Sequence, residues 1–238
     1  MKTWVIIPTY NEAQNIEALL QSIMDLKLPN LLALVVDDNS PDGTGPIADQ
    51  MAKDNPNIKV LHRFQNRGRG SAGIEGFKQA LTKGADYIVE MDADFSHHPK
   101  YIPDLLKFAP QYDIVIGSRY VTGGQDADRG IIRQIITFLA RQYIRLILEV
   151  KVKDPTSGFR CFKRQVLVDI NLDRLISTGP SIVSEILYKA KQKGFSTHEI
   201  PIVFEDRKKG STKLNLMTLI KTLFMVLKFR LNCEEPRK

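Results

Sequence analysis

The chain has 238 residues, of which 43% are hydrophobic, enough for one large α/β domain with a sizeable core. Lys and Arg outnumber Asp and Glu by 34 to 27, and the resulting formal charge of +7 suits anionic partners such as nucleotides or lipid headgroups. The two cysteines, Cys161 and Cys233, lie far apart and outside any C-x-x-C spacing, so neither a disulfide framework nor a zinc site is indicated. A reducing, cytoplasmic location is expected.

The apolar segments are too short or too charged to cross a membrane. The amino-terminal run in MKTWVIIPTYNE is shorter than a signal peptide or a membrane span requires. The most apolar long segment, residues 214–231, contains Lys221, Lys228 and Arg230. We therefore expect this segment to form a helix that lies on a surface.

Short β-rich runs alternate with segments of helical periodicity in the first half of the chain. The expected strands are residues 4–8, 31–38, 58–62, 86–94 and 113–119, and the expected helices are residues 12–26, 44–54, 71–83 and 100–108. Asn11 is expected to open the first helix, with Glu12 in its first turn. This alternation predicts a mainly parallel, Rossmann-like sheet with helices on both faces.

The second half of the chain does not show this regular alternation of strands and helices. The expected elements are a polar loop at 121–130, a long basic amphipathic helix near 130–149, a helix near 181–193, a strand at 198–204 and a terminal helix. No internal repeat, low-complexity tract or linker divides the chain, so residues 1–238 are expected to form a single domain.

Polar motifs follow the expected strands. The ligand crevice of such a sheet lies at the carboxyl ends of its strands, so these motifs should gather at one rim. They are PTYNE (8–12), DDNSPDGT (37–44), DADFSHHP (92–99) and GSRY (117–120). The first of them occupies the place where a dinucleotide-binding domain carries G-x-G-x-x-G, which disfavours a dehydrogenase.

Two pairs of carboxylates lie among these motifs. Asp37 and Asp38 could accept hydrogen bonds from a ribose or a base edge, although a solvated turn explains them equally well. Asp92 and Asp94 would point the same way if their strand continued, because side chains on a strand alternate. Their hard oxygen atoms suit Mg²⁺ or Mn²⁺ that also binds substrate phosphates.

Two adjacent histidines raise a rival metal site. His97 and His98 could bind zinc or iron, but neighbouring side chains diverge on an extended chain and no third nitrogen or sulfur ligand lies nearby. The favoured interpretation is that both brace the turn before Pro99.

A glycine-rich turn, GRGSAG at residues 68–73, precedes a helix. It could hold a phosphate with help from Arg63, Arg67 and Arg69, or it could be a simple loop.

Two basic clusters occupy the second half. A polar stripe, spaced by four residues on an otherwise apolar helix, comprises Arg133, Thr137, Arg141 and Arg145. It suits a membrane surface or a lipid phosphate, or equally the solvated face of a core helix. A basic loop with Arg207, Lys208, Lys209 and Lys213 could close over an anion or simply be hydrated.

Together the motifs resemble those of the family 2 glycosyltransferases, most closely the dolichol-phosphate (polyprenol-phosphate) mannose synthases. The resemblance covers nearly the whole chain and rests on PTYNE, VVDDNSPDGT (35–44), GSAG (70–73), MDADFSHHP (91–99), GSRY, TSGFR (156–160) and FEDRKKGSTK (204–213). It implies a GT-A fold with a nucleotide-sugar half at 1–120 and an acceptor and membrane-facing half at 121–238, which ends in amphipathic helices.

The resemblance also implies site residues, with Mg²⁺ or Mn²⁺ as cofactor, GDP-mannose as donor and a polyprenyl or dolichyl phosphate as acceptor. The implied nucleotide-binding residues are Pro8, Tyr10, Glu12, Val36 and Asp38. The implied diphosphate segment is Asp92, Ala93 and Asp94, with Asp94 and Asp92 as metal ligands. Residues implied at the donor and acceptor phosphates are Arg119, Arg207 and Lys213, and those at the lipid phosphate are Arg133 and Thr137. Catalysis is expected to depend on Asp94, Arg119, Arg133 and Arg207.

Three departures from the family pattern matter. Asn66, with Arg67 and Arg69 nearby, replaces a lysine that is common before the glycine-rich turn. STGPSIVSE (177–185) replaces an aromatic GY-x-FQ-x-E run and retains Glu185, which bears on the sugar or acceptor. The carboxyl-terminal transmembrane domains of some relatives are missing, so we expect peripheral attachment to the cytoplasmic face of a membrane through amphipathic helices, or through a membrane-anchoring partner subunit.

The chemistry expected of such a site requires no strong base, because the second pKa of a lipid phosphate is about 6 and the group is already anionic. Aligning two repelling phosphates and stabilising the leaving diphosphate is the main task, and an inverting displacement is expected. The alternatives are a related transferase that moves glucose or N-acetylglucosamine to polyprenyl phosphate or a glycan, a silent binding subunit, and a nucleic-acid-binding protein. The intact DAD motif disfavours the silent subunit, and no nucleic-acid-binding module is recognisable.

Overall fold

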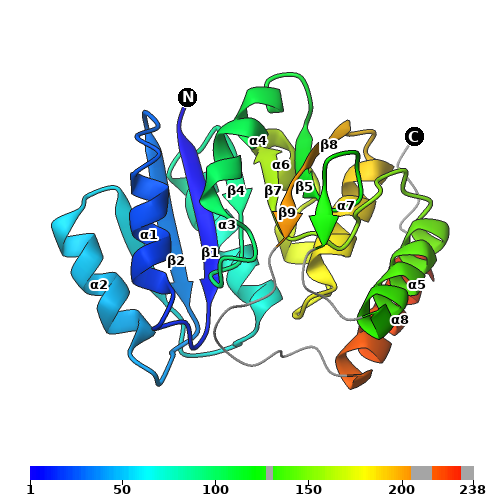
Figure 1. The fold of residues 1–238 in the computed structure, drawn as a ribbon, viewed down its shortest axis with the longest axis horizontal. Coiled ribbons are helices and arrows are strands. Elements are labelled where there is room, and N and C mark those ends of the chain that lie inside the picture. Colours follow the sequence, from blue (N-terminus) through cyan, green and yellow to red (C-terminus); the bar gives the residue numbers. More distant parts are fainter. Residues whose placement is uncertain (127–130, 205–215, 232–238) are drawn as a thin grey trace.

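A seven-stranded sheet with helices on both faces forms the centre of the molecule (Figure 1), in a computed structural model that describes residues 1–126, 131–204 and 216–231. The strands of this sheet are β1 (Thr3–Thr9), β2 (Leu31–Asp37), β3 (Ile58–His62), β4 (Tyr87–Glu90), β5 (Ile114–Ser118), β7 (Arg160–Lys163) and β8 (Thr197–Pro201). Their order is β3-β2-β1-β4-β7-β5-β8, and all neighbours are parallel except β7, which runs antiparallel to β4 and β5. The mainly parallel α/β sheet predicted from the sequence is confirmed.

The helices divide between the two faces of the sheet. One face carries α1 (Ile16–Met24), α2 (Thr44–Asp54) and α4 (Ile102–Phe108). The other face carries α3 (Arg69–Thr82), α6 (Arg164–Asp169), α7 (Ile182–Gln192) and the ends of α5 (Ile131–Leu148) and α8 (Leu216–Leu231). Alternation along β1 feeds both cores, since Val5 and Ile7 join the first and Trp4 and Ile6 join the second.

A close approach between α3 and β1 depends on a glycine. A Cβ atom added at Gly76 would lie 2.3 Å from Cγ2 of Ile6, so only glycine lets the helix pack at this distance. The contact places the amino terminus of α3 beside the carboxyl end of the sheet.

Several boundaries differ from the prediction. The first helix begins at Ile16, because Asn11 has a left-handed φ of 60° and the carbonyl of Glu12 accepts a turn hydrogen bond from Asn15. The fourth strand ends at Glu90 and not at 94. The last strand is two pieces, β8 and β9 (Val203–Phe204), and β9 pairs with β6 (Gln125–Asp126) in a small second sheet.

Two elements between residues 150 and 180 were not predicted. They are β7 and the following α6, with the 3₁₀ turns η1 (Pro99–Tyr101) and η2 (Leu172–Arg174) elsewhere. A four-residue strand that contains Arg160 and Lys163 has no local β signal, and its place in the sheet comes from the burial of Cys161 and Phe162. Within the described ranges, no helix is long and apolar enough to cross a bilayer.

Candidate active site

The sequence-predicted rim exists at the carboxyl ends of the parallel strands. In Figure 1 the arrows of β1 and β2 point to the same lower edge, and their registers pair Thr9 with Asp37 and Asp37 with His62. Because β7 is antiparallel, the chain enters it at this edge, so residues 156–158 join the rim from far along the sequence. The tertiary fold therefore assembles PTYNE, DDNSPDGT, DADFSHHP, GSRY and TSG in one place.

The turns after β1 and β2 hold each other. Oγ of Ser40 accepts from the backbone N–H of Asn11 at 3.0 Å, and Oγ1 of Thr44 accepts from that of Glu12 at 2.9 Å. Asp37 is buried and accepts from the hydroxyl of Ser40 at 2.5 Å. Asp37 therefore braces its own turn, while Tyr10 remains 37% exposed above the rim.

Asp38 organises the glycine-rich turn. Its side chain is buried, pairs with the guanidinium of Arg63 and accepts from the N–H of Gly68 at 2.7 Å. Arg63 also donates to the carbonyl of Asn66 at 2.7 Å. The structure thus places Arg63 in an internal ion pair, and it fastens the turn at 66–68 to the end of β2.

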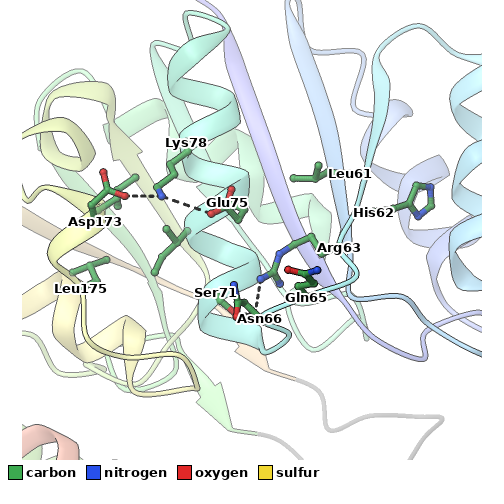
Figure 2. Close-up of a pocket in the computed structure, with 12 residues that line it drawn as sticks. Leu61, His62, Arg63, Gln65, Asn66, Ser71, Glu75, Lys78, Asp173 and Leu175 are labelled. Carbon is green, nitrogen blue, oxygen red and sulfur yellow. Dashed lines mark hydrogen bonds and ion pairs between the residues drawn. The ribbon is translucent and has the colours of Figure 1, made fainter.

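A pocket of about 480 Å³ lies beside this turn (Figure 2). Its lining includes Arg63, Asn66 and Ser71, and an ion pair between Lys78 and Asp173 at 2.7 Å spans its far side. None of the rim carboxylates at 92 and 94 lines it. This pocket therefore borders the glycine-rich turn without containing the metal-type oxygen atoms.

The DAD turn gives its two aspartates different surroundings. Asp94 is 5% exposed, and its Oδ1 accepts from the backbone N–H of Ser96 at 3.1 Å and from its hydroxyl at 2.5 Å. The side chain of Asp92 is 32% exposed, and Ala93 between them is buried. Since β4 ends before both, the expected common direction of an extended strand does not apply.

Both histidines hold backbone in this turn. Nδ1 of His97 accepts from the N–H of Asp92 at 3.1 Å, and its ring stacks on Phe159 with centroids 5.2 Å apart. Burial lowers the pKa of His97, which favours the neutral ring that this acceptor role requires. His98 accepts from the N–H of Lys100 at 3.1 Å and caps η1. In the part of the chain that the structure describes, no group of three His, Cys, Asp or Glu side chains could hold a metal ion.

Arg69, the first residue of α3, links the core to the rim. Its Nε and Nη2 donate to Oδ1 of Asp92 at 3.2 and 3.0 Å, and its Nη1 donates to Glu90 at 3.0 Å. Glu90 is 1% exposed and lies opposite Arg160 in the β4–β7 register. Burial raises the pKa of Glu90, and the charge of Arg69 opposes this rise. The sequence left Arg69 as one of three arginines that could help to hold a phosphate, with a simple loop as the alternative, and gave no sign of Glu90, because the pair forms only when β4 and α3 pack.

Arg119 is fixed by a carboxylate that the sequence did not single out. It donates from Nε and Nη2 to the two oxygen atoms of Asp154, both at 2.8 Å, and from Nη2 to Thr156 at 2.8 Å. Its guanidinium carbon lies 5.1 Å from the ring centroids of Tyr120 and Phe204. Burial raises the pKa of Asp154, but Arg119 outweighs it and holds the pKa below its ordinary value.

The segment that departs from the family pattern packs against the glycine-rich turn. Glu185 is buried and accepts from the backbone N–H groups of Ile176 and Ser177 at 2.8 and 2.9 Å. The carbonyl of Thr178 in turn accepts from the N–H of Gly70 at 3.0 Å. Glu185 therefore holds the loop that supports the start of α3.

The basic stripe of α5 faces the protein. Thr137, Arg141 and Arg145 are half-buried, and the Arg141 guanidinium lies 3.7 Å from the ring centroid of Tyr120. Arg141 is therefore partly covered by the protein, and the alternatives of a lipid-phosphate site and a solvated face stay predictions. The side chain of Arg133 and the whole of the basic loop with Arg207 and Lys213 lie outside the described residues.

This geometry defines an α/β enzyme fold whose rim carries carboxylates and fixed arginines. The structure of glucosyl-3-phosphoglycerate synthase from Mycobacterium tuberculosis, solved with Mn²⁺, UDP and glucosyl-3-phosphoglycerate, superposes with a TM-score of 0.73 at 20% identity, over 100% of this chain and 81% of that chain. A second structure of that synthase, with Mg²⁺ and UDP, gives a TM-score of 0.70 at 19% identity, over 100% of this chain and 81% of that one. The fold is the GT-A fold.

Residues 4–170 match Glycosyl transferase family 2, and the chain belongs to that family of enzymes. It is 39% identical to an undecaprenyl-phosphate mannosyltransferase of Micrococcus luteus, over 90% of this chain and 88% of that protein. It is 38% identical to a polyprenol monophosphomannose synthase of Mycolicibacterium smegmatis, over 94% of this chain and 85% of that protein. Identity to a dolichol-phosphate mannosyltransferase of Pyrococcus furiosus is 38% over 94% of this chain, which spans 62% of that protein.

Proposed function

We propose that this glycosyltransferase moves mannose from GDP-mannose to a polyprenyl monophosphate with inversion, giving a β-linked polyprenyl phosphate mannose. The observation that carries the proposal is identity of 38–39% to relatives named for mannosyl transfer to undecaprenyl, polyprenol or dolichol phosphate, over at least 90% of this chain. The rim supports the proposal, because its carboxylate oxygens can bind a divalent cation and its arginines, held in place by carboxylates, can neutralise charge on two phosphate groups.

The nucleotide is proposed to lie over the ends of β1 and β2. Pro8 and Val36 pair in the register of these strands and are buried, which makes a rigid floor. Tyr10 is exposed above it, and Glu12 is oriented by Asn15, which donates to its carboxylate at 2.8 Å. Asp38 already accepts hydrogen bonds from Arg63 and Gly68. Each carboxylate oxygen can accept more than one hydrogen bond, so Asp38 is proposed to accept a further one from the nucleotide.

A divalent cation fits the donor set of the DAD turn. Asp94 and Asp92 supply hard carboxylate oxygens, which Mg²⁺ and Mn²⁺ prefer, and both lie where the chain leaves the sheet. When bound there, such an ion would supply positive charge to the diphosphate of the donor. Ser96 and Arg69 orient the two carboxylates in advance, which lowers the cost of organising the site.

The proposed reaction needs positioning more than proton transfer. An oxygen of the acceptor phosphate forms a bond to the anomeric carbon while the bond from that carbon to the diphosphate oxygen of GDP breaks, and the electron pair leaves with GDP. The acceptor is anionic at neutral pH, since its second pKa is about 6, so no strong base is required. Arg119, held rigidly by Asp154, is proposed to stabilise phosphate charge, and Arg133, Thr137, Arg207 and Lys213 are proposed around the acceptor phosphate.

The location follows from the acceptor. A polyprenyl chain resides in a membrane, so we include a peripheral position on the cytoplasmic face in the proposal. The proposal also includes a partner subunit that anchors the protein to the membrane.

The test is transfer of labelled mannose by purified protein to a short polyprenyl phosphate in detergent, with Mn²⁺, Mg²⁺ or EDTA. We expect turnover with GDP-mannose, loss with EDTA, and a β anomer in the NMR spectrum of the product. Asp94→Ala should abolish turnover, whereas Asp104→Ala, an exposed aspartate on α4, should not change it. Arg133→Ala should raise the acceptor KM or lower kcat.

Three results would contradict parts of the proposal. Preferential use of UDP-glucose or UDP-N-acetylglucosamine would favour the related transferase. Full activity of Asp94→Ala would refute the metal ligand, and a retained anomer would refute the direct displacement.

A further inference from the structure

Arg69 places a fixed positive charge beside the turn where a divalent cation is proposed to bind. Its Nε and Nη2 atoms both donate to Oδ1 of Asp92, at 3.2 and 3.0 Å. The remaining nitrogen, Nη1, donates to Oε1 of Glu90 at 3.0 Å. All three nitrogen atoms of the guanidinium are therefore engaged by carboxylates.

The TSG turn (156–158) encloses this guanidinium. A Cβ atom added at Gly158 would lie 2.5 Å from Nη2 of Arg69, so the backbone of the turn passes very close to the group. The same Cβ would lie 3.6 Å from the ring of His97, whose Nδ1 accepts from the backbone N–H of Asp92. Arg69 therefore cannot swing toward a bound phosphate without breaking both of its ion pairs.

The charges around the DAD turn nearly cancel. Three carboxylates, those of Glu90, Asp92 and Asp94, lie at the end of β4 or just after it. Two guanidinium groups oppose them, since Arg160 lies opposite Glu90 in the β4–β7 register and Arg69 binds both Glu90 and Asp92. A single negative charge remains. The turn by itself therefore attracts a divalent cation only weakly.

A nucleoside diphosphate would change this balance. Mg²⁺ is commonly held by one or two carboxylates together with the phosphates of a substrate. Over residues 1–126, 131–204 and 216–231, no three side chains of His, Cys, Asp or Glu form a group that could hold a metal ion. The diphosphate of the donor can supply both the further oxygen ligands and the further negative charge.

Arg69 has two opposing effects on cation binding at Asp92. It orients the carboxylate, which favours binding, and its charge repels the cation and competes for the same oxygen atom. A short carboxylate side chain has little rotamer freedom to lose, whereas a guanidinium and a divalent ion on the same partly buried carboxylate repel each other strongly. The effect of the charge should therefore exceed the effect of orientation.

We propose that Arg69 is a resident counter-ion of Asp92 that keeps the DAD turn from binding a divalent cation tightly until a nucleoside diphosphate is present. Arg69 acts through Asp92 and does not touch the reacting atoms, so it is a positioning residue. The inference rests on the proposed function only in assigning a nucleoside diphosphate and a divalent cation to this turn.

The experiment titrates the purified full chain with Mn²⁺ without nucleotide and follows free Mn²⁺ by its electron paramagnetic resonance signal. Wild-type protein should bind weakly. Arg69→Met/Glu90→Met should bind at least about tenfold more tightly, because Asp92 loses its counter-ion. Arg69→Lys retains the charge and should remain close to the wild type. Arg67→Met, at an exposed position, is the matched control and should not change the affinity.

The choice of variants protects the test against misfolding. The double variant removes the buried carboxylate of Glu90 together with Arg69, which avoids leaving that carboxylate without its cation. Adding Asp92→Asn to the double variant should abolish the gain in Mn²⁺ affinity, because Asp92 is the carboxylate that Arg69 releases. A tighter binding that then disappears requires folded protein in the double variant.

A nucleotide arm separates this inference from the proposed function. The titrations are repeated with GDP or UDP, and the nucleotide without protein serves as the blank. GDP should raise the Mn²⁺ affinity of the wild type more than that of the double variant. If neither nucleotide raises it, the proposed donor and metal assignments fail, while the nucleotide-free comparison of the variants still decides the role of Arg69.

Several results would overturn the inference. One is tight Mn²⁺ binding by wild-type protein without nucleotide. Another is unchanged or weaker binding by the double variant, which would leave Arg69 with an orienting role alone. A gain that survives Asp92→Asn, or an equal gain in Arg69→Lys, would show that release of the Asp92 charge is not the cause.

Discussion

Arg69 donates two hydrogen bonds to a single oxygen of Asp92, at 3.2 and 3.0 Å, while its remaining nitrogen holds the buried Glu90. The guanidinium therefore connects the end of β4 to the turn where a metal is proposed to bind. Arg69 itself is only partly exposed, with 23% of its side chain accessible. Arg69, which begins α3, therefore also binds the adjacent carboxylates of Glu90 and Asp92.

Removing Arg69 should destabilise the fold through Glu90. Arg69→Met leaves a carboxylate that is 1% exposed without its nearest cation, and we expect a loss of about 3 kcal/mol in the free energy of unfolding. Arg69→Met/Glu90→Met should recover part of this loss, since the buried carboxylate is removed together with its cation, while the buried Arg160 opposite it loses the charge of Glu90. Urea unfolding measures the cycle, with Arg67→Met, an exposed neighbour, as the control. Equal losses in the single and double variants would refute the coupling.

Asp154 should make stability sensitive to acid. Its pKa in the fold lies below the ordinary 3.8, so its contribution is complete above that pH and is lost as the pH falls through the folded pKa. Asp154→Asn should cost about 3 kcal/mol at neutral pH by leaving Arg119 unpaired, yet show a shallower loss of stability below about pH 4. Urea midpoints measured down the acid range test this slope. An acid slope equal to that of the wild type would assign the sensitivity to other groups.

Gly70 should tolerate no side chain. A Cβ atom there would lie 2.7 Å from the carbonyl carbon of Thr178 and 2.8 Å from the carbonyl oxygen of Gly179, both backbone atoms that cannot move cheaply. Gly70→Ala should therefore cost about 2 kcal/mol by overpacking. Gly179→Ala, where a Cβ meets nothing within 4 Å, should be close to neutral. Thermal midpoints of the two variants provide the comparison, and similar values would contradict it.

Glu185 should resist even a conservative change. Each of its oxygen atoms accepts from a backbone N–H, so Glu185→Gln turns an amide group toward a donor and loses one hydrogen bond. We expect a loss of about 2 kcal/mol, because hydrogen bonds to a buried charge are among the stronger ones. Glu17→Gln, at an exposed position on α1, is the control in urea unfolding. Unchanged stability of Glu185→Gln would mean that the loop at 176–178 holds without it.

The predictable part of the fold came from local pattern. Runs such as WVIIP and LLALVV carry the β signal in consecutive residues, and the rim followed from parallel pairing alone. The antiparallel β7 was missed because RCFK has no such signal. For the same reason the position of residues 156–158 at the rim was not predicted from the strand pattern. Glu90 and Asp154 were missed for a related reason: the partner of each is distant in sequence, and a lone acidic residue gives no sign of which cation it will meet.

By itself the sequence determined the class of fold, the edge at which the polar motifs meet and the family to which the enzyme belongs, since strand pattern and ordered motifs are properties of the chain. Only the tertiary structure decided which of those polar residues face a substrate and which hold the scaffold. Asp37, Asp38 and Arg63 brace turns, and Arg119 is clamped by Asp154. It also decided that Arg141 of α5 lies over Tyr120 beside the buried Ile144 while Leu139 is exposed, because periodicity gives a helix two faces but only packing selects the buried one.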